Sequence, residues 1–115
     1  VGMAYPYGTY DERVIKIAKE IGIKYARTAG TSMKFTVPDD LMRYTGTCHF
    51  SNADIFKLID EFESIPDDGS KNVLYIWGHT YEFDVLDKWN LLDDILERLK
   101  RVKAEFVTNR EAFGL

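Results

Sequence analysis

Residues 74–84 place an imidazole beside carboxylates at a point where a buried strand should end. The apolar run stops at Gly78, His79 follows at once, and Glu82 and Asp84 come close behind. Histidine is the side chain whose ordinary pKa lies nearest neutrality, so an imidazole held beside a carboxylate is suited to proton transfer. We therefore expect His79 to be a catalytic acid or base. A purely structural histidine is the alternative.

A second turn could supply a hydrogen-bond donor. In residues 4–8, Pro6 fixes its own φ angle and biases the preceding residue toward extended backbone, while Gly8 permits a sharp turn. The main-chain N–H of Tyr7 could then point into a pocket and stabilise a developing oxyanion. The alternative is a simple strand-to-helix turn with an exposed aromatic ring.

Other side chains are candidates for binding a substrate. His49 comes at the expected end of another strand, although a structural or surface role is the alternative. Aromatic faces offer apolar area with a polar edge, so Tyr5 and Tyr81 could stack on sugar rings or instead pack within the fold. None of these residues is expected to bind a metal.

The helices that must position these residues begin with a recognisable pattern, a hydroxyl side chain followed three residues later by an acidic one. The pattern occurs in three pairs: Thr9 with Glu12, Ser51 with Asp54, and Thr108 with Glu111. The first pair predicts a helix over about 10–21, ended by Gly22 in a left-handed conformation. A further helix is predicted over about 88–103.

Apolar residues at helical spacing predict which face of each helix is buried. The first stripe consists of Val14, Ile17, Ala18 and Ile21. The second consists of Ile55, Leu58, Ile59 and Phe62, and the third of Leu92, Ile95, Leu96, Leu99 and Val102.

Segments rich in β-branched and aromatic residues separate the helices. They are residues 23–27, 42–49, 73–77 and 105–107. Alternating strands and helices predict an α/β fold with right-handed crossovers and a parallel sheet, whose active groups lie at the carboxyl ends of the strands. Tyr7, Arg27, His49 and His79 should then share one rim. The long connection 28–41 should be a loop on that rim.

Composition excludes several classes of function. The net charge of −4 provides no basic surface for a phosphate backbone, so nucleic acid is not an expected partner. No apolar run approaches the ~20 residues that cross a bilayer, so we expect a soluble protein without a membrane partner. Cys48 is the only cysteine, which excludes an intrachain disulfide and a multi-cysteine zinc site.

Two motifs in order give the chain a resemblance to a known family. Residues 4–11 and 74–83, separated by the segment 22–28, resemble the C-terminal half of the polysaccharide deacetylases. This is the NodB-homology group, carbohydrate esterase family four. The likeness covers nearly all of the chain. It implies that residues 1–115 are the C-terminal part of a catalytic domain, a distorted (β/α) barrel with seven strands that is incomplete here.

The same resemblance implies metal-dependent hydrolysis of acetyl groups on sugars. The family holds a divalent metal, which we expect to be zinc, with one Asp and two His from motifs that should precede residue 1. No Asp-Asp-Gly follows a strand here, and no His-x-x-x-His spacing occurs. We therefore expect the isolated chain to bind no catalytic metal and to be inactive. Since the natural N-terminus is expected to lie upstream, the compartment stays open.

Individual residues carry over as follows. Tyr7 matches the tyrosine whose main-chain N–H stabilises the tetrahedral intermediate, and His79 matches the histidine that protonates the leaving group. Trp77 replaces the usual leucine of the acetyl pocket. Ala4 replaces an arginine that orients the catalytic Asp, a role that Arg27 could take over. The residue that orients His79 is left open among Glu82, Asp84 and Asp39.

Partners and alternatives follow from this interpretation. An acetylated carbohydrate is the expected substrate. Part of a barrel leaves an apolar face and an open edge, so either the missing N-terminal half or a second copy should cover it. A non-catalytic carbohydrate-binding or assembly module with the same fold is the first alternative. An unrelated small α/β domain is the second.

Overall fold

A computed structural model describes residues 1–115. Its helices are α1 (Glu12–Glu20), α2 (Ile55–Glu63), α3 (Thr80–Val85), α4 (Trp89–Lys100) and α5 (Asn109–Ala112). Its strands are β1 (Gly2–Ala4), β2 (Tyr25–Arg27), β3 (Cys48–His49) and β4 (Ile76–Trp77), and short 3₁₀ turns span Pro6–Gly8 and Leu41–Arg43. None of the helices combines the length and the apolar character that crossing a bilayer requires.

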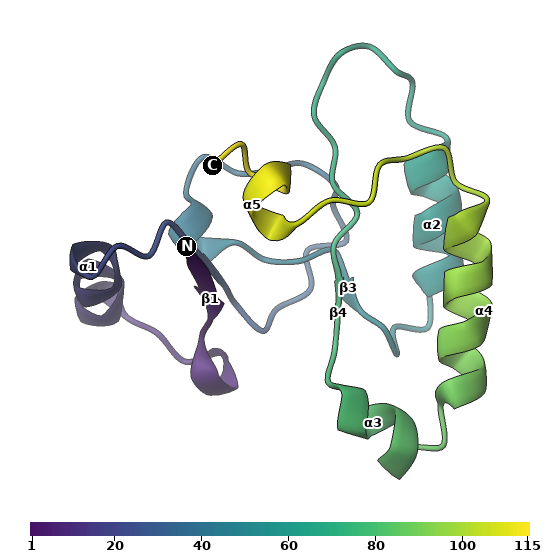
Figure 1. The fold of residues 1–115 in the computed structure, drawn as a ribbon, viewed down its shortest axis with the longest axis horizontal. Helices are drawn as coiled ribbons and strands as arrows, with labels where there is room; N and C mark the ends of the chain where they lie inside the picture. Colours follow the sequence, from purple (N-terminus) through teal and green to yellow (C-terminus); the bar gives the residue numbers. More distant parts are fainter.

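The strands pair in parallel. β1 lies beside β2 with Ala4 opposite Arg27, and β3 lies beside β4 with His49 opposite Trp77. A parallel bridge between Arg27 and Tyr44 continues the ladder from β2 toward β3. Figure 1 shows β1 and β4 running in the same direction, so their carboxyl ends lie at one end of the molecule. These strands do not close a barrel, and the barrel stays a prediction.

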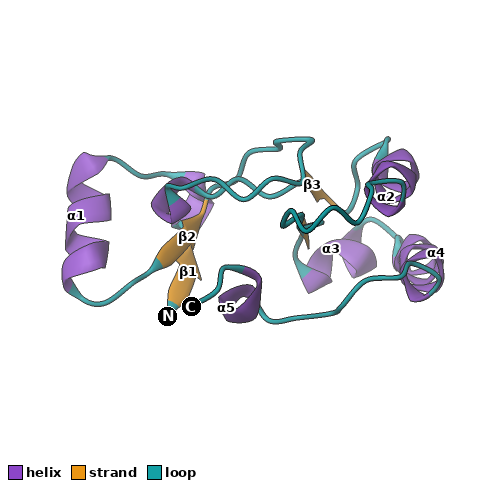
Figure 2. Ribbon diagram, turned by 90° about the horizontal axis from the view of Figure 1, so that it is seen from above, coloured by secondary structure: helices purple, strands orange, loops and turns teal.

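The molecule is a flat slab. Its principal extents are 41 × 40 × 19 Å and its radius of gyration is 15.0 Å, whereas a compact domain of this length has about 13 Å. Figure 2 shows α1 at one end of the slab, α2 and α4 at the other, and the short strands between them. Only 19 of the 115 residues are buried, so the fold leaves much of its apolar surface uncovered.

The main core lies where α2 and α4 pack beside the β3–β4 pair. Ile55, Leu58 and Ile59 of α2 are buried, as the apolar spacing predicts. From α4, Ile95 is buried, and Arg98 ties the two helices together through an ion pair to Asp60 at 2.7 Å. This end of the slab therefore contains the largest cluster of buried apolar residues.

Helix α1 differs from its prediction in its first residue and its buried face. Asp11, not Thr9, is the N-cap, because its carboxylate accepts a hydrogen bond from the main-chain N–H of Val14. The buried residues are Ile15 and Ala18. Three members of the predicted stripe are exposed instead: Val14, Ile17 and Ile21. The predicted stripe is confirmed at Ala18 and wrong at the other three positions, because only a narrow side of α1 is covered.

Other element predictions have mixed outcomes. The capping box of Thr108 and Glu111 is confirmed, and Gly22 has a φ of 92° as the predicted left-handed cap. Helix α2 starts at Ile55 with Asp54 as its N-cap, so Ser51 does not begin it. The strand predicted at 105–107 is wrong, since that segment has no strand pairing. Helix α3 has no counterpart among the predicted helices.

Two buried acids should make the fold sensitive to alkali. Burial raises the pKa of Cys48 to about 11 and the pKa of Tyr44 to about 12. Both groups are neutral when protonated, so the unfolded chain releases these protons at a lower pH than the folded chain. The free energy of unfolding should therefore fall as pH rises from about 9 toward 12. Urea unfolding at a series of pH values measures this fall.

The control for that experiment is Cys48→Ala, which removes one of the two acids from a site that is fully buried. Its free energy of unfolding should fall less steeply with pH than that of the wild type. A free energy of unfolding that stays constant or rises above pH 9 would contradict the prediction.

Candidate functional site

A carboxylate in the first turn of α3 joins the two histidines of the chain. Glu82 Oε2 lies 2.9 Å from His49 Nε2, 2.8 Å from the main-chain N of His79 and 3.4 Å from His79 Nδ1. The bond from the His79 N–H to Glu82 is the carboxylate half of a capping box. The capping geometry of a short helix thus brings both imidazoles to one negative charge.

Glu82 is held in its charged form by these donors. The main-chain N–H of His79 lowers the pKa of Glu82 below its usual value, and the hydrogen bond from His49 adds to the lowering against the opposing effect of partial burial. Glu82 is therefore ionised at neutral pH. Asp84 makes only a long contact of 3.5 Å with Trp89 Nε1, so Glu82 is the acid that contacts His79.

His49 is largely packed against aromatic rings and is hydrogen-bonded at both ring nitrogens. It ends β3, and its ring lies 4.4 Å from the ring of Phe50 and 4.8 Å from that of Trp77. Its Nδ1 lies 2.7 Å from Ser51 Oγ and accepts a hydrogen bond from the Ser51 main-chain N–H at 3.2 Å. The imidazole thus has a partner at each nitrogen, with Glu82 at Nε2.

His79 is more open to solvent than His49. Its side chain is 55% exposed, compared with 20% for His49. Because Nδ1 faces Glu82, Nε2 is the nitrogen available to a ligand. The exposed ring of Tyr81 lies 5.4 Å from the imidazole, where it could contact the same ligand.

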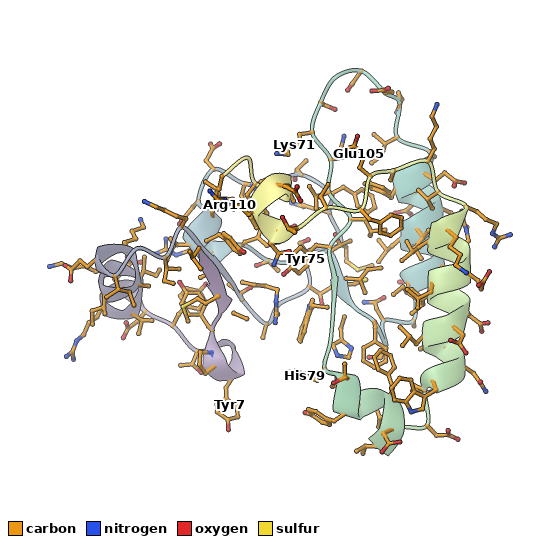
Figure 3. The ribbon with its side chains drawn as sticks, in the orientation of Figure 1. Tyr7, Lys71, Tyr75, His79, Glu105 and Arg110 are labelled. Atoms are coloured by element: carbon orange, nitrogen blue, oxygen red, sulfur yellow. The ribbon has the colours of Figure 1, made fainter.

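Tyr7 sits in a strained turn after β1. Its φ of 56° lies in the left-handed region that non-glycine residues seldom adopt. Its main-chain N–H donates to no group of the chain, since the hydrogen bonds of the turn begin with Gly8 donating to the Tyr5 carbonyl. Figure 3 shows Tyr7 and His79 toward the same end of the molecule. The turn therefore presents a free donor there, while the Tyr7 ring is fully exposed.

Tyr5 is not placed to bind a sugar. Its side chain is buried, its hydroxyl donates to the Met42 carbonyl at 2.8 Å, and its ring stacks on Tyr10 at 4.8 Å. The predicted substrate contact at Tyr5 is therefore wrong. The residue packs in the core with Ile15 and Ala18 of α1.

Arg27 and Trp77 meet across the two strand pairs. The guanidinium carbon lies 4.2 Å from the centre of the indole ring, and Nη1 donates to the Thr28 carbonyl at 2.8 Å. Both side chains line an open, mostly apolar groove of about 590 Å³. Neither Tyr7 nor His79 lines this groove. Of the residues predicted to share one rim, His49 and His79 meet at Glu82, and the Trp77 ring connects Arg27 with His49.

The residues present do not fit the metal that the resemblance implies. No group of three or more His, Cys, Asp or Glu side chains is arranged to hold a metal ion. Although Glu82 contacts both histidines, its Oε2 is already engaged by three nitrogen atoms. No catalytic step through a metal is therefore assigned to this chain.

Gly78 allows the histidine pair to form and gives a testable expectation. A Cβ at Gly78 would lie 2.4 Å from Cδ1 of the buried Phe50 and 3.4 Å from His49 Nε2. Phe50 packs against Phe83 with ring centres 4.3 Å apart, so its ring cannot move away easily from the added Cβ. Gly78→Ala should lower the free energy of unfolding by about 1–3 kcal/mol, measured by urea unfolding.

Gly30→Ala is the matched control, because the nearest atom to its added Cβ would be a Thr45 methyl group at 3.2 Å. Its effect should be smaller than that of Gly78→Ala. Equal effects of the two substitutions would contradict the packing role assigned to Gly78.

Two participants in the site escaped the sequence analysis. Ser51 matched a helix N-cap pattern, yet its side chain bonds to His49. The sequence predicts only a strand end at Gly78, whereas its close contact with Phe50 depends on packing between distant segments. The i, i+2 spacing of His49 and Ser51 is the one local signal that could have indicated the first of these contacts.

Comparison of the chain with protein-family models, with curated proteins and with solved structures found no match.

Proposed function

We propose that this chain forms part of a hydrolase that removes acetyl groups from an acetylated sugar or polysaccharide, at an amide or an ester bond. The observation that carries the proposal is the half-exposed His79 imidazole, whose Nδ1 faces the ionised Glu82 and whose Nε2 is available. A paired imidazole of this kind is suited to donating a proton. The resemblance of the two motifs to polysaccharide deacetylases supplies the class of substrate.

His79 would act at the collapse of the tetrahedral intermediate. Water adds to the acetyl carbonyl and gives its proton to a base that this proposal does not place among residues 1–115, and the bond to the sugar nitrogen or oxygen then breaks. The departing atom takes a proton from His79 Nε2, while Glu82 stabilises the imidazolium through Nδ1 at 3.4 Å. The products are acetate and the free amine or hydroxyl of the sugar.

Tyr7 would stabilise the charge that develops before this collapse. Its main-chain N–H has no partner in the chain, and the left-handed turn fixes its direction. A preorganised donor of this kind favours the transition state because it needs no reorganisation when the oxyanion forms. Tyr81 would contact the sugar beside His79.

The metal that the resemblance implies has no set of ligands among these residues. We therefore assign to this chain the acid and one oxyanion donor only. The test is acetate release from acetylated chitooligosaccharide and from acetylated xylan by the protein that contains residues 1–115. Release from either substrate is expected, and the isolated chain should release none. The absence of release from both substrates by that protein would overturn the proposal.

A non-catalytic carbohydrate-binding or assembly module is the second candidate. Ala4 stands where the deacetylases usually have an arginine, and the exposed rings of Tyr7 and Tyr81 could bind sugars without any chemistry. Calorimetry separates the two functions. Saturable binding of the oligosaccharide without acetate release would favour the module.

The proposal also includes a binding partner that covers the apolar groove of this molecule. The molecule is 19 Å thick, and its groove of about 590 Å³ is lined mainly by apolar residues. An exposed apolar surface of this kind is typical of an interaction site. We expect another part of the barrel, or a second copy, to cover it. Sedimentation of residues 1–115 at micromolar concentration should therefore show a species heavier than 13.3 kDa. A compact monomer would contradict this expectation.

A further inference from the structure

The hydrogen bonds of His49 determine which of its ring nitrogens carries the proton. The Ser51 main-chain N–H can only donate, so Nδ1, at 3.2 Å, must be the acceptor. Ser51 Oγ lies 2.7 Å from the same nitrogen and can donate to it as well. In the neutral ring the proton is therefore on Nε2, where it is donated to Glu82 Oε2 at 2.9 Å.

The position of this imidazole is fixed by packing as well as by bonding. Its ring lies between those of Phe50 and Trp77, at 4.4 and 4.8 Å. Phe50 is buried, and the parallel register places His49 opposite Trp77. The Nε2–H donor is thus held on the sheet, while the carboxylate that it meets is on α3.

Glu82 receives this donor in addition to the capping bond from the main-chain N–H of His79. Its side chain has three rotatable bonds, is 21% exposed, and is otherwise held only through His79. A donor on the sheet selects the rotamer in which Oε2 reaches both the main-chain N–H and Nδ1 of His79. The His49 donor thus reaches the same oxygen atom that faces the imidazole of His79.

We propose that His49 is a positioning residue, which holds Glu82 through a fixed Nε2–H tautomer and through Glu82 orients the imidazole of His79. Its importance for catalysis rests on the proposed function, whereas the positioning itself does not. His49 does not contact the substrate in this arrangement. It acts on the reaction only through Glu82 and His79.

The first arm of the test is NMR of the ¹⁵N-labelled chain. In the wild type at pH 8, His49 should show an unprotonated Nδ1 and a protonated Nε2. His49→Phe keeps an aromatic ring between Phe50 and Trp77 but has no donor, whereas His49→Gln keeps an N–H near the Nε2 position. The amide proton of His79, which donates to Glu82, should shift upfield in His49→Phe and stay near its wild-type position in His49→Gln.

Two NMR results would overturn the proposal. One is a protonated Nδ1 on His49 in the wild type, which requires no variant to fold. The other is a His79 amide resonance that is unchanged in a folded His49→Phe variant. A merely structural role of His49 would leave that resonance in place while lowering stability.

The second arm measures deacetylation by the protein that contains these residues. His49→Phe should lower kcat about tenfold with little change in KM, and His49→Gln should recover most of the loss. An unchanged kcat in His49→Phe would overturn the link to catalysis and leave the proposed function standing. If the wild type releases no acetate while the NMR results are as expected, the proposed function fails and the positioning by His49 stands.

Discussion

Replacement of His79 by alanine should reduce kcat for deacetylation about 10²- to 10⁴-fold, the usual contribution of a positioned general acid. KM should change little, because the imidazole gives up its proton only as the bond to the sugar breaks. The side chain is 55% exposed, so its removal should not unfold the protein. Acetate release under saturating substrate measures the effect, with the unfolding midpoint as a check on stability.

Val85→Ala is the control for this experiment. Val85 lies in α3, like Glu82, and is 75% exposed, so its truncation changes the helix surface without touching either histidine. Its kcat should stay within about twofold of the wild-type value. A His79→Ala variant as active as Val85→Ala would exclude His79 as the acid.

The strand end at His79 could be predicted from local sequence, whereas the carboxylate that contacts His79 could not. The change from an apolar run to Gly78 and His79 locates the end of β4, and a hydroxyl-and-acid pair locates the start of α5. The sequence does not show which of Glu82, Asp84 and Asp39 contacts His79. The answer depends on the geometry of the first turn of α3. Only there does a carboxylate three residues after His79 reach back to its main-chain N–H.

Contacts between distant segments explain most of what the sequence analysis missed. His49 meets Glu82 because β3 pairs with β4 in a register that places His49 opposite Trp77. No local pattern specifies a register between strands 28 residues apart along the chain, from 48 to 76. In the same way, Ser51 has a typical N-cap sequence, yet its hydroxyl bonds to His49 in the structure.

Helix α1 illustrates the limit of apolar periodicity. The spacing of Val14, Ile17 and Ile21 marks one side of a helix, but all three are exposed. Periodicity identifies a face that could be buried, and burial then depends on whether another element covers it. In a slab 19 Å thick, α1 at one end has few neighbours, and only Ile15 and Ala18 are covered.

The largest effect on stability is expected at Ile59. Its side chain is fully buried in the core between α2, α4 and the β3–β4 pair. Ile59→Ala removes buried methyl groups and leaves a cavity that the packed neighbours fill only in part, so the free energy of unfolding should fall by about 2–5 kcal/mol. That is a large fraction of the stability of a small protein, roughly 5–15 kcal/mol. The midpoint of urea unfolding measures the loss.

Ile21→Ala is the matched control, because it deletes the same atoms from a side chain that is 74% exposed. It should change the free energy of unfolding by less than about 0.5 kcal/mol. The difference between the two variants isolates burial from the intrinsic effect of exchanging isoleucine for alanine. Equal losses would mean that the α2–α4 core is no better packed than the surface of α1, and would refute the assignment of the main core to that region.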